Sequence, residues 1–316
     1  MPAMLVIPVN LRQPLQLSPM LALCLALVTH CTRPTATREL VIAHPEALAA
    51  VPLSLAAESP LAGEKIRLKP YTDHALAVAE FLRGESDLLF TGTTLGAMQA
   101  GRGVKLWRTL VWGTASIVLK PGDKPSAQPA LAQLNGKRVA LPFRGSPNDI
   151  QFRRLIEIQK VKPIIEYQQH AQAAASLLAG KVDAAILPEP LASKLIAQHG
   201  LARLAELSAL EERALPTEAP APMVSLFVGP QLSTEKMQRL PELERRLVDI
   251  VARVEKDPGA IAALYAQKFQ VTHDVLREGL RYTHFALPEA GVARKRTASF
   301  LRAAGIAESG DTFFMP

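Results

Sequence analysis

Two stretches of the chain carry the same pattern of apolar and polar positions. FLRGESDLLFTGTTLGAM at residues 81–98 and LLAGKVDAAILPEPLASK at residues 177–194 align at an offset of 96 residues. In each stretch an apolar helix end is followed by a glycine, Gly84 or Gly180, then by an aspartate and an apolar strand. Glycine suits the left-handed position that ends many helices. Each stretch therefore predicts a helix, a strand and a second helix with short links, which is typical of a parallel α/β sheet.

Apolar strands and linkers divide the chain around this repeat. Strands at residues 40–43 and 138–141 open the two halves, and linker-like segments lie at residues 120–130 and 215–222. After residue 229 the apolar residues keep helical spacing, and a last helix is expected to stop at Gly305. Two further apolar strands are interpreted as the crossings between the halves: residues 116–119 and 225–228.

The sequence thus predicts an α/β protein with two lobes, each built on a parallel-rich sheet with flanking helices. One continuous sheet through both copies of the repeat would contradict this organisation. The expected divisions are residues 1–37 as signal peptide and leader, residues 38–118 and 225–316 as lobe I, and residues 119–224 as lobe II.

Composition supports a globular protein and excludes several classes of site. The chain has 316 residues, of which 48% are hydrophobic and 21% charged, as in soluble two-domain proteins. The formal net charge is +7, but the basic residues are scattered and their densest run, residues 293–296, is short, so nucleic-acid binding is not expected. The seven histidines show no close ligand spacing, so neither a metal site nor a cofactor is expected.

The N-terminal segment predicts export. The apolar run at residues 20–28 is too short to span a bilayer but fits a secretory signal. A buried N-terminal helix is the alternative, and Pro14 and Pro19 disfavour it. We expect a periplasmic protein that has lost about residues 1–31.

The two cysteines, Cys24 and Cys31, both lie in this segment, so the body of the chain has no disulfide, thiol nucleophile or cysteine zinc site. The sequence LVTHC at residues 27–31 resembles a bacterial lipoprotein box with Cys31 as the lipid anchor, although His30 is not small. A lipid-anchored protein and a plainly secreted protein both remain open.

Four short segments follow predicted strands, and ligands of open α/β sheets bind beyond such strand ends. We expect these segments to converge on one cleft. They are residues 44–46, 91–94, 144–148 and 188–190.

The stretch LPFRGSPNDIQF at residues 141–152 predicts a helix start. Ser146 is the expected N-cap, Pro147 the first helical residue and Asp149 a capping-box partner. A helix N-terminus favours an anion, Gly145 allows close approach of the backbone, and Arg144 adds a cation suited to a carboxylate, sulfonate or phosphate. Arg144 is either such a ligand-binding residue or an exposed loop arginine.

The other candidate ligand-binding residues lie at the same ends or near the crossings. Thr93 could instead be a helix N-cap. Glu189, held between two prolines, either accepts hydrogen bonds from an amine on the ligand or is solvated. With Arg144, Gly145 and Ser146, the candidates are His44, Glu46, Thr91, Gly92, Thr93, Thr114, Ser116, Glu189 and Ser225.

Three motifs resemble one family. GKRVALPFRGSPNDIQFRRLIE at residues 136–157, LLAGKVDAAILPEPLASKL at residues 177–195 and FLRGESDLLFTGTTLGA at residues 81–97 are similar to motifs of ABC-importer solute-binding proteins of the nitrate, sulfonate and taurine type. The resemblance extends from about residue 38 to the C-terminus. It implies a type 2 periplasmic-binding fold with a hinge, which captures a small polar or anionic solute and delivers it to an ABC permease in the inner membrane. We expect a monomer.

Two alternatives to transport remain. An enzyme of cofactor or pyrimidine biosynthesis could share this fold, but no cysteine follows residue 31 to hold a cofactor and no histidine-rich site is visible. The chain is therefore expected not to be an enzyme. A solute sensor for signalling would differ from a transport protein only in its partner.

Overall fold

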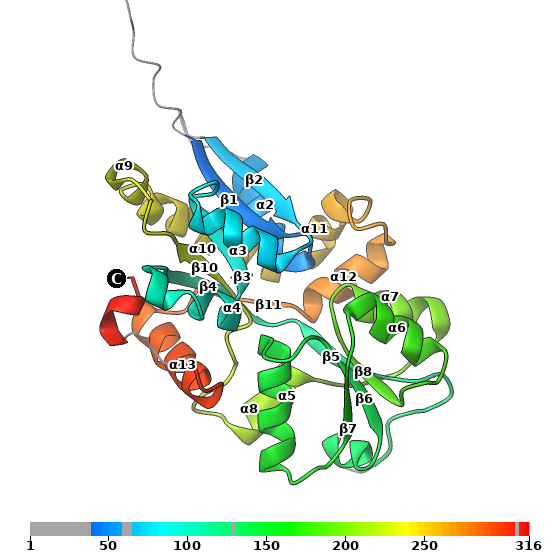
Figure 1. The fold of residues 1–316 in the computed structure, drawn as a ribbon. Coiled ribbons are helices and arrows are strands. Elements are labelled where there is room, and N and C mark those ends of the chain that lie inside the picture. Colours follow the sequence, from blue (N-terminus) through cyan, green and yellow to red (C-terminus); the bar gives the residue numbers. More distant parts are fainter. Residues whose placement is uncertain (1–38, 59–64, 128–129, 307–309, 316) are drawn as a thin grey trace, which may run out of the picture. The chain divides into compact units, whose positions relative to one another are not determined.

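The computed structural model describes residues 39–58, 65–127, 130–306 and 310–315. These residues form two β-sheets with helices packed against them (Figure 1), which confirms the predicted α/β fold. The two strands of the internal repeat, β3 (Leu88–Gly92) and β8 (Ala184–Pro188), lie in different sheets. The predicted leader, with Cys31, lies outside the described residues.

The larger sheet has six strands in the order β11-β4-β10-β3-β1-β2. β1 runs parallel to β2 and β3, β10 runs antiparallel to β3 and β4, and β11 is antiparallel to β4. Besides β3, its strands are β1 (Glu39–Pro45), β2 (Lys65–Tyr71), β4 (Lys105–Gly113), β10 (Val224–Val228) and β11 (His284–Phe285).

The smaller sheet has five strands in the order β7-β6-β8-β5-β9. β6 runs parallel to β7 and β8, and β5 runs antiparallel to β8 and β9. Besides β8, its strands are β5 (Ala115–Leu119), β6 (Arg138–Leu141), β7 (Ile164–Tyr167) and β9 (Arg203–Glu206).

Strand β5 corrects one expected boundary. Residues 115–118 were expected in lobe I, whereas β5 pairs on both edges within the smaller sheet. The run ASIVL is apolar throughout and fits a buried strand in either sheet, so its pairing partners decide its place. The chain therefore passes from one sheet to the other at Thr114, and it returns between α8 and β10. The wider division into two lobes stays a prediction.

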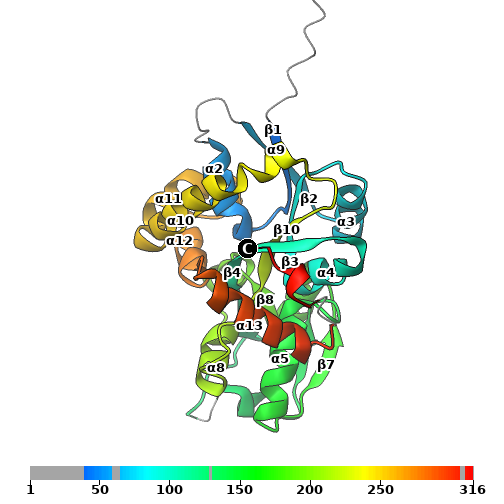
Figure 2. The ribbon, with the colours of Figure 1, turned by 90° about the vertical axis from the view of Figure 1, so that its left-hand side faces the viewer.

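Helices cover both faces of each sheet. Figure 2 shows α2, α10, α11 and α12 on one side of the larger sheet and α3 and α4 on the other. The helices are η2 (Leu48–Ala50), α2 (Val51–Glu58), α3 (His74–Leu82), α4 (Thr93–Ala97), η3 (Ala100–Arg102), η4 (Ala130–Leu134), α5 (Pro147–Ile158), α6 (His170–Leu178), α7 (Leu191–His199), α8 (Leu207–Ala214), α9 (Thr234–Met237), α10 (Leu240–Lys256), α11 (Pro258–Tyr265), α12 (His273–Arg281), α13 (Ala290–Ala303) and η5 (Gly310–Phe313).

Each sheet has an apolar core on both faces. Side chains of α2 and α10 pack with one face of the larger sheet, and those of α3 and α13 pack with the other. α5 and α8 cover one face of the smaller sheet, and α6 and α7 cover the other. Burial on both faces explains why the inner strands β3, β5 and β8 read as nearly continuous apolar runs, whereas the edge strand β2 alternates.

The repeat glycines have the predicted backbone. Gly84 and Gly180 have φ angles of 81° and 67°, in the left-handed region. Each lies two residues after the last residue of its helix, α3 or α6, which is the position that favours glycine.

The aspartate of each repeat holds the start of a neighbouring strand. Asp87 Oδ2 accepts a hydrogen bond from the Val41 N–H at 2.8 Å, and Asp183 Oδ2 accepts one from the Arg138 N–H at 2.9 Å. Each carboxylate also pairs with a lysine, at 2.6 and 2.7 Å. The two copies of the repeat thus share side-chain contacts as well as backbone pattern.

Candidate functional site

A cavity of about 420 Å³ is lined by residues that follow strands of both sheets. All four expected strand ends contribute to it, through Glu46, Gly92, Ser146 and Glu189. Its volume falls within the range of small-molecule sites, roughly 300–1,000 Å³. We call it the central cavity. Its other lining residues are Pro45, Ala47, Ala49, Tyr71, Thr72, His74, Leu95, Thr114, Pro142, Phe143, Pro147, Asn148, His170, Pro188, Pro190, Leu191, Met223, Val224 and Phe269.

The helix that begins at this cavity has the predicted N-cap, Ser146, but Asp149 does not close the predicted capping box, because the Ser146 N–H bonds to the Phe143 carbonyl instead. Ser146 is the N-cap of α5, and its Oγ accepts a hydrogen bond from the Asp149 N–H at 3.2 Å. Asp149 is fully buried, and its Oδ2 accepts a hydrogen bond from the Gly145 N–H at 2.8 Å. The Tyr167 hydroxyl donates to the other carboxylate oxygen at 2.8 Å. This network fixes the loop after β6 against the start of α5.

Arg144 is exposed and does not line the central cavity. Its guanidinium carbon lies 5.0 Å from the centroid of the Tyr167 ring. The next residue, Gly145, uses its carbonyl to accept a hydrogen bond from the Thr94 hydroxyl at 2.8 Å. Because Thr94 belongs to α4, beside the larger sheet, this bond joins the two halves of the described chain.

Three of the expected hydroxyl ligands are buried away from the cavity. Thr93 Oγ1 and Ser225 Oγ are 2.7 Å apart, and Thr109 Oγ1 lies 2.8 Å from the same serine. Thr91 is buried, with its Oγ1 3.4 Å from Nδ1 of His74. Thr93 of α4 and Ser225 of β10 thus bond each other, and Thr91 contacts His74 of α3. Of the expected threonines only Thr114 lines the central cavity.

Glu189 lines the cavity but has an internal partner. Its Oε1 lies 2.7 Å from Nη1 of Arg203, and its Oε2 accepts a hydrogen bond from the Ser193 N–H at 3.1 Å. Burial raises the pKa of Glu189, and the Arg203 guanidinium opposes that shift. The carboxylate therefore has its charge compensated by the protein itself.

Arg203 lies behind Glu189 and was not among the residues that the sequence singled out. It lies on β9 and donates hydrogen bonds to Ser116 and to Ser193, besides pairing with Glu189. Its guanidinium carbon lies 3.5 Å from the centroid of the Tyr282 ring, which follows α12. Ser116, an expected ligand, is thus engaged by an arginine behind the cavity wall.

Two histidines from different halves lie at the central cavity. Burial lowers the pKa of both His74 and His170, and each is mainly uncharged at neutral pH. Nδ1 of His170 and Oδ1 of Asn148 are buried, and neither has a hydrogen-bond partner among the described residues. Buried polar atoms are normally hydrogen-bonded, so these two atoms suggest positions for a ligand.

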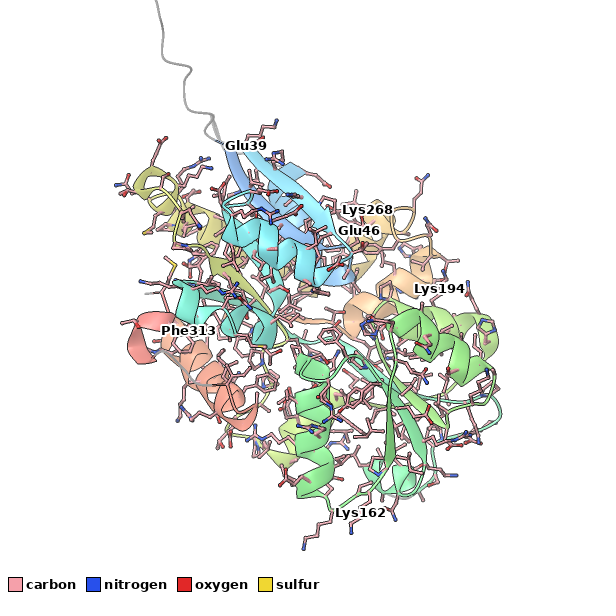
Figure 3. The ribbon with its side chains drawn as sticks, in the orientation of Figure 1. Glu39, Glu46, Lys162, Lys194, Lys268 and Phe313 are labelled. Atoms are coloured by element: carbon pink, nitrogen blue, oxygen red, sulfur yellow. The ribbon has the colours of Figure 1, made fainter. Side chains whose placement is uncertain are left out.

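His44 lies in an adjoining cavity of about 460 Å³. We call it the rim cavity, because it shares Glu46 and Phe269 with the central cavity and adds Lys268. Figure 3 shows Glu46 and Lys268 close together there. Burial lowers the pKa of His44. The expected ligands His44 and Glu46 therefore share the rim cavity, and Glu46 alone also reaches the central one.

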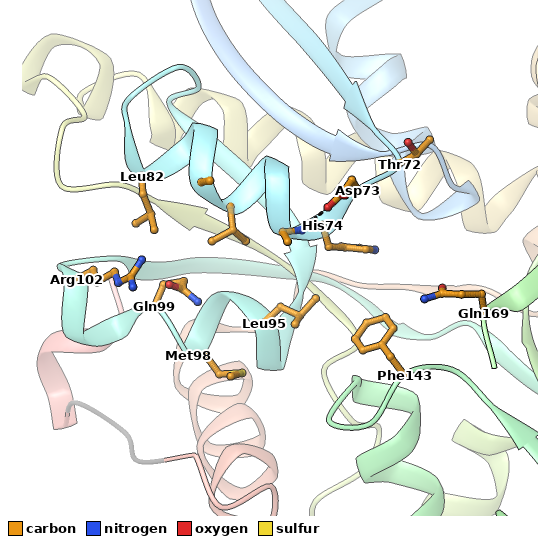
Figure 4. Close-up of a pocket in the computed structure, with 13 residues that line it drawn as sticks. Thr72, Asp73, His74, Leu82, Leu95, Met98, Gln99, Arg102, Phe143 and Gln169 are labelled. Carbon is orange, nitrogen blue, oxygen red and sulfur yellow. Dashed lines mark hydrogen bonds between the residues drawn. The ribbon is translucent and has the colours of Figure 1, made fainter. Parts of the chain in front are cut away.

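A third hollow, of about 740 Å³, continues outward between α3 and α4. We call it the outer groove. Figure 4 shows His74, Leu95 and Phe143, which come from three separate segments, lying toward one another at one end of it. All three also line the central cavity, so they form the wall between the two spaces.

Within the described ranges, no group of three or more His, Cys, Asp or Glu side chains could hold a metal ion. No helix in the part of the chain that the structure describes is long and apolar enough to cross a membrane.

Comparisons by sequence find no relative. No protein-family model matches the chain, and no curated protein matches it significantly.

Comparison of structures does find similar proteins. An ABC transporter from Parabacteroides distasonis aligns with a TM-score of 0.70 at 18% identity, over 88% of this chain and 99% of that one. The alkanesulfonate-binding protein of Xanthomonas axonopodis pv. citri, bound to MOPS, aligns with a TM-score of 0.63 at 19% identity, over 85% and 94%. The periplasmic aliphatic sulphonate-binding protein of Escherichia coli aligns with a TM-score of 0.66 at 18% identity, over 85% and 86%. The chain therefore has the fold of ABC-transporter solute-binding proteins, as its motifs predict.

Proposed function

We propose that the protein is the solute-binding component of an ABC importer. The central cavity carries this proposal, because residues from strand ends of both sheets surround one small, partly apolar space. The similarity of the whole fold to sulfonate-binding proteins supports it. A small polar solute would be captured there and passed to a membrane permease.

The way the chain connects the two sheets would allow two lobes to close around a solute. The chain passes between them at Thr114 and again in the segment between α8 and β10. Few backbone crossings allow two lobes to open and close around a solute. Closure excludes water from the solute, which strengthens each hydrogen bond to it because the local dielectric falls.

Five of the residues expected from the sequence are proposed to contact the solute: Glu46, Gly92, Thr114, Ser146 and Glu189. To these the cavity adds Asn148, His74 and His170, which the sequence did not single out. We propose binding without catalysis.

Export, removal of about residues 1–31 and action as a monomer complete the proposal. If Cys31 carries a lipid, the protein is anchored to the membrane, and if it does not, the protein is secreted. Mass spectrometry of the natively produced protein would show an N-terminal diacylglycerol-cysteine in the first case. An intact N-terminus in the cytoplasm would contradict export.

A thermal-shift screen tests the proposed function. Small anions, sulfonates, amino acids, amides and heterocycles are added to the protein, and a ligand should raise the melting temperature. Thr72→Trp should abolish that rise, because Thr72 is exposed and lines both the central cavity and the outer groove, so the indole would obstruct entry.

Thr234→Trp is the matched control, since Thr234 is exposed on α9 and lines none of these spaces. If both variants lose the ligand-induced shift to the same extent, or if neither variant loses it, binding in the central cavity is contradicted.

A further inference from the structure

The central cavity has no cation to receive an anion. Among its described lining residues there is no lysine or arginine, while two carboxylates, Glu46 and Glu189, are present. The start of α5 adds little positive charge, because Pro147 has no N–H, the Asp149 and Ile150 N–H groups bond to Ser146, and the Asp149 carboxylate is buried in the first turn. An anionic solute would therefore lose its hydration without gaining a side-chain cation, which is costly in a buried site.

The three cationic side chains near the central cavity have contacts outside it. Arg203 pairs with Glu189 behind the cavity wall. Lys268 lies in the rim cavity, with Nζ 3.5 Å from the Ser54 hydroxyl and 5.7 Å from the centroid of the Tyr265 ring. Arg144 lies over an aromatic ring outside the lining.

Two polar atoms at the cavity have no partner among the described residues: Oδ1 of Asn148 and Nδ1 of His170. Asn148 Oδ1 is an amide carbonyl oxygen, which only accepts hydrogen bonds. Burial lowers the pKa of His170, and Nδ1 of a neutral histidine accepts a hydrogen bond in one tautomer and donates in the other. An N–H group on the solute would satisfy Asn148 Oδ1, and His170 can adopt the tautomer that matches the solute.

The rest of the lining is largely apolar and includes aromatic rings. Tyr71, Phe143 and Phe269 come from three different segments, and Leu95 adds an aliphatic side chain. Such walls favour a ring or a short apolar body.

We infer that the solute is an uncharged molecule with an N–H hydrogen-bond donor on a ring-sized apolar body, rather than an anion. This inference rests on the proposed function and specifies its ligand.

Matched amide and carboxylate compounds provide the test. Nicotinamide is compared with nicotinate and benzamide with benzoate, and uracil, MOPS and nitrate are added as further probes. Each pair has the same ring but differs in charge and in N–H donors. The inference requires that the amide of at least one pair binds more tightly than its carboxylate and than MOPS and nitrate, by isothermal titration calorimetry. Any other ranking overturns it.

Two substitutions at Asn148 identify the group that binds there. Asn148→Leu removes the acceptor and should weaken the amide about ten-fold or more. Asn148→Asp keeps an acceptor, so the amide should bind within about three-fold of the unmodified protein, whereas an anion would be repelled. Thermal unfolding of both variants without ligand shows that they remain folded. An amide that tolerates leucine and is lost with aspartate would overturn the inference.

Failure of the inference differs from failure of the proposed function. If an anion binds, is weakened by Arg144→Ala and is blocked by Thr72→Trp, solute binding stands and only the ligand class is wrong. If no compound in the thermal-shift screen raises the melting temperature, both fail.

Discussion

Replacement of Arg203 by methionine should leave the carboxylate of Glu189 buried without its cation. The Glu189 side chain is 0% exposed and that of Arg203 is 13% exposed, with 2.7 Å between the paired atoms. Methionine retains most of the apolar stem but none of the hydrogen bonds to Ser116 and Ser193. The variant therefore isolates the loss of charge and donors behind the cavity wall.

The expected cost follows from burial. Breaking a buried ion pair on one side typically costs about 3–5 kcal/mol, because the remaining charge stays desolvated. The slight exposure of Arg203 favours the lower end, about 3 kcal/mol. Adding Glu189→Gln removes the stranded charge, so the double variant should recover at least about 1 kcal/mol relative to Arg203→Met alone.

The pH dependence has a definite sign. Burial raises the pKa of Glu189 above its ordinary value of 4.5, and loss of Arg203 removes a group that opposes this rise. The folded variant then binds a proton more tightly than the unfolded chain, so its stability increases as pH falls from 7 toward the unfolded pKa. The stability of the double variant should lack this increase.

Urea unfolding followed by circular dichroism at pH 7 and pH 5.5 measures all of these quantities. Arg67→Met is the matched control, because the Arg67–Glu39 pair has a similar separation of 2.8 Å but Arg67 is 47% exposed. This control should lose no more than about 1 kcal/mol. A loss below 1 kcal/mol in Arg203→Met, with no change between the two pH values, would refute the reasoning.

Two further predictions concern packing and pH. Gly96→Ala would place its Cβ 2.1 Å from the ring of Phe227, so it should destabilise the fold by at least about 1–3 kcal/mol in chemical denaturation, while Gly101→Ala, with nothing within 4 Å, should not. The hydrogen bond that His284 donates to the Glu206 carboxylate raises the pKa of His284, so its stabilising effect is complete below the unfolded pKa of 6.5 and lost as pH rises through the folded pKa. Glu206→Gln should flatten that part of a plot of melting temperature against pH, and an unchanged plot would contradict the contact.

The parts of the fold that the sequence predicted are those set by local chemistry. The cap at Ser146 requires a hydroxyl before Pro147, and the helix ends at Gly84 and Gly180 require a left-handed residue. These signals lie within a few residues of the structure that they determine. Because the two repeat units are similar, these local signals also predicted two sheets, with one unit in each.

The sequence could not predict how distant segments of the chain pair. The apolar strand at residues 115–119 fits either sheet, and only its neighbours β8 and β9 assign it to the smaller one. Arg203 opens the short strand RLAE, and nothing in this local sequence indicates a partnership with Glu189, 14 residues earlier.

Site residues were predicted in part for the same reason. Strand ends locate the cavity, so Glu46, Gly92 and Ser146 were found, and Thr114 was found because it lies near a crossing between the halves. A hydroxyl near a strand end can face either the cavity or the core, and sequence does not distinguish these directions. Thr93 and Ser225 face the core and bond each other.

A crystal structure with the compound that binds most tightly in the thermal-shift screen would show directly where the solute binds. We expect the compound in the central cavity, in contact with residues of both sheets and with a donor within about 3.2 Å of Asn148 Oδ1. A compound held only in the outer groove or the rim cavity, or touching the residues of one sheet alone, would contradict it.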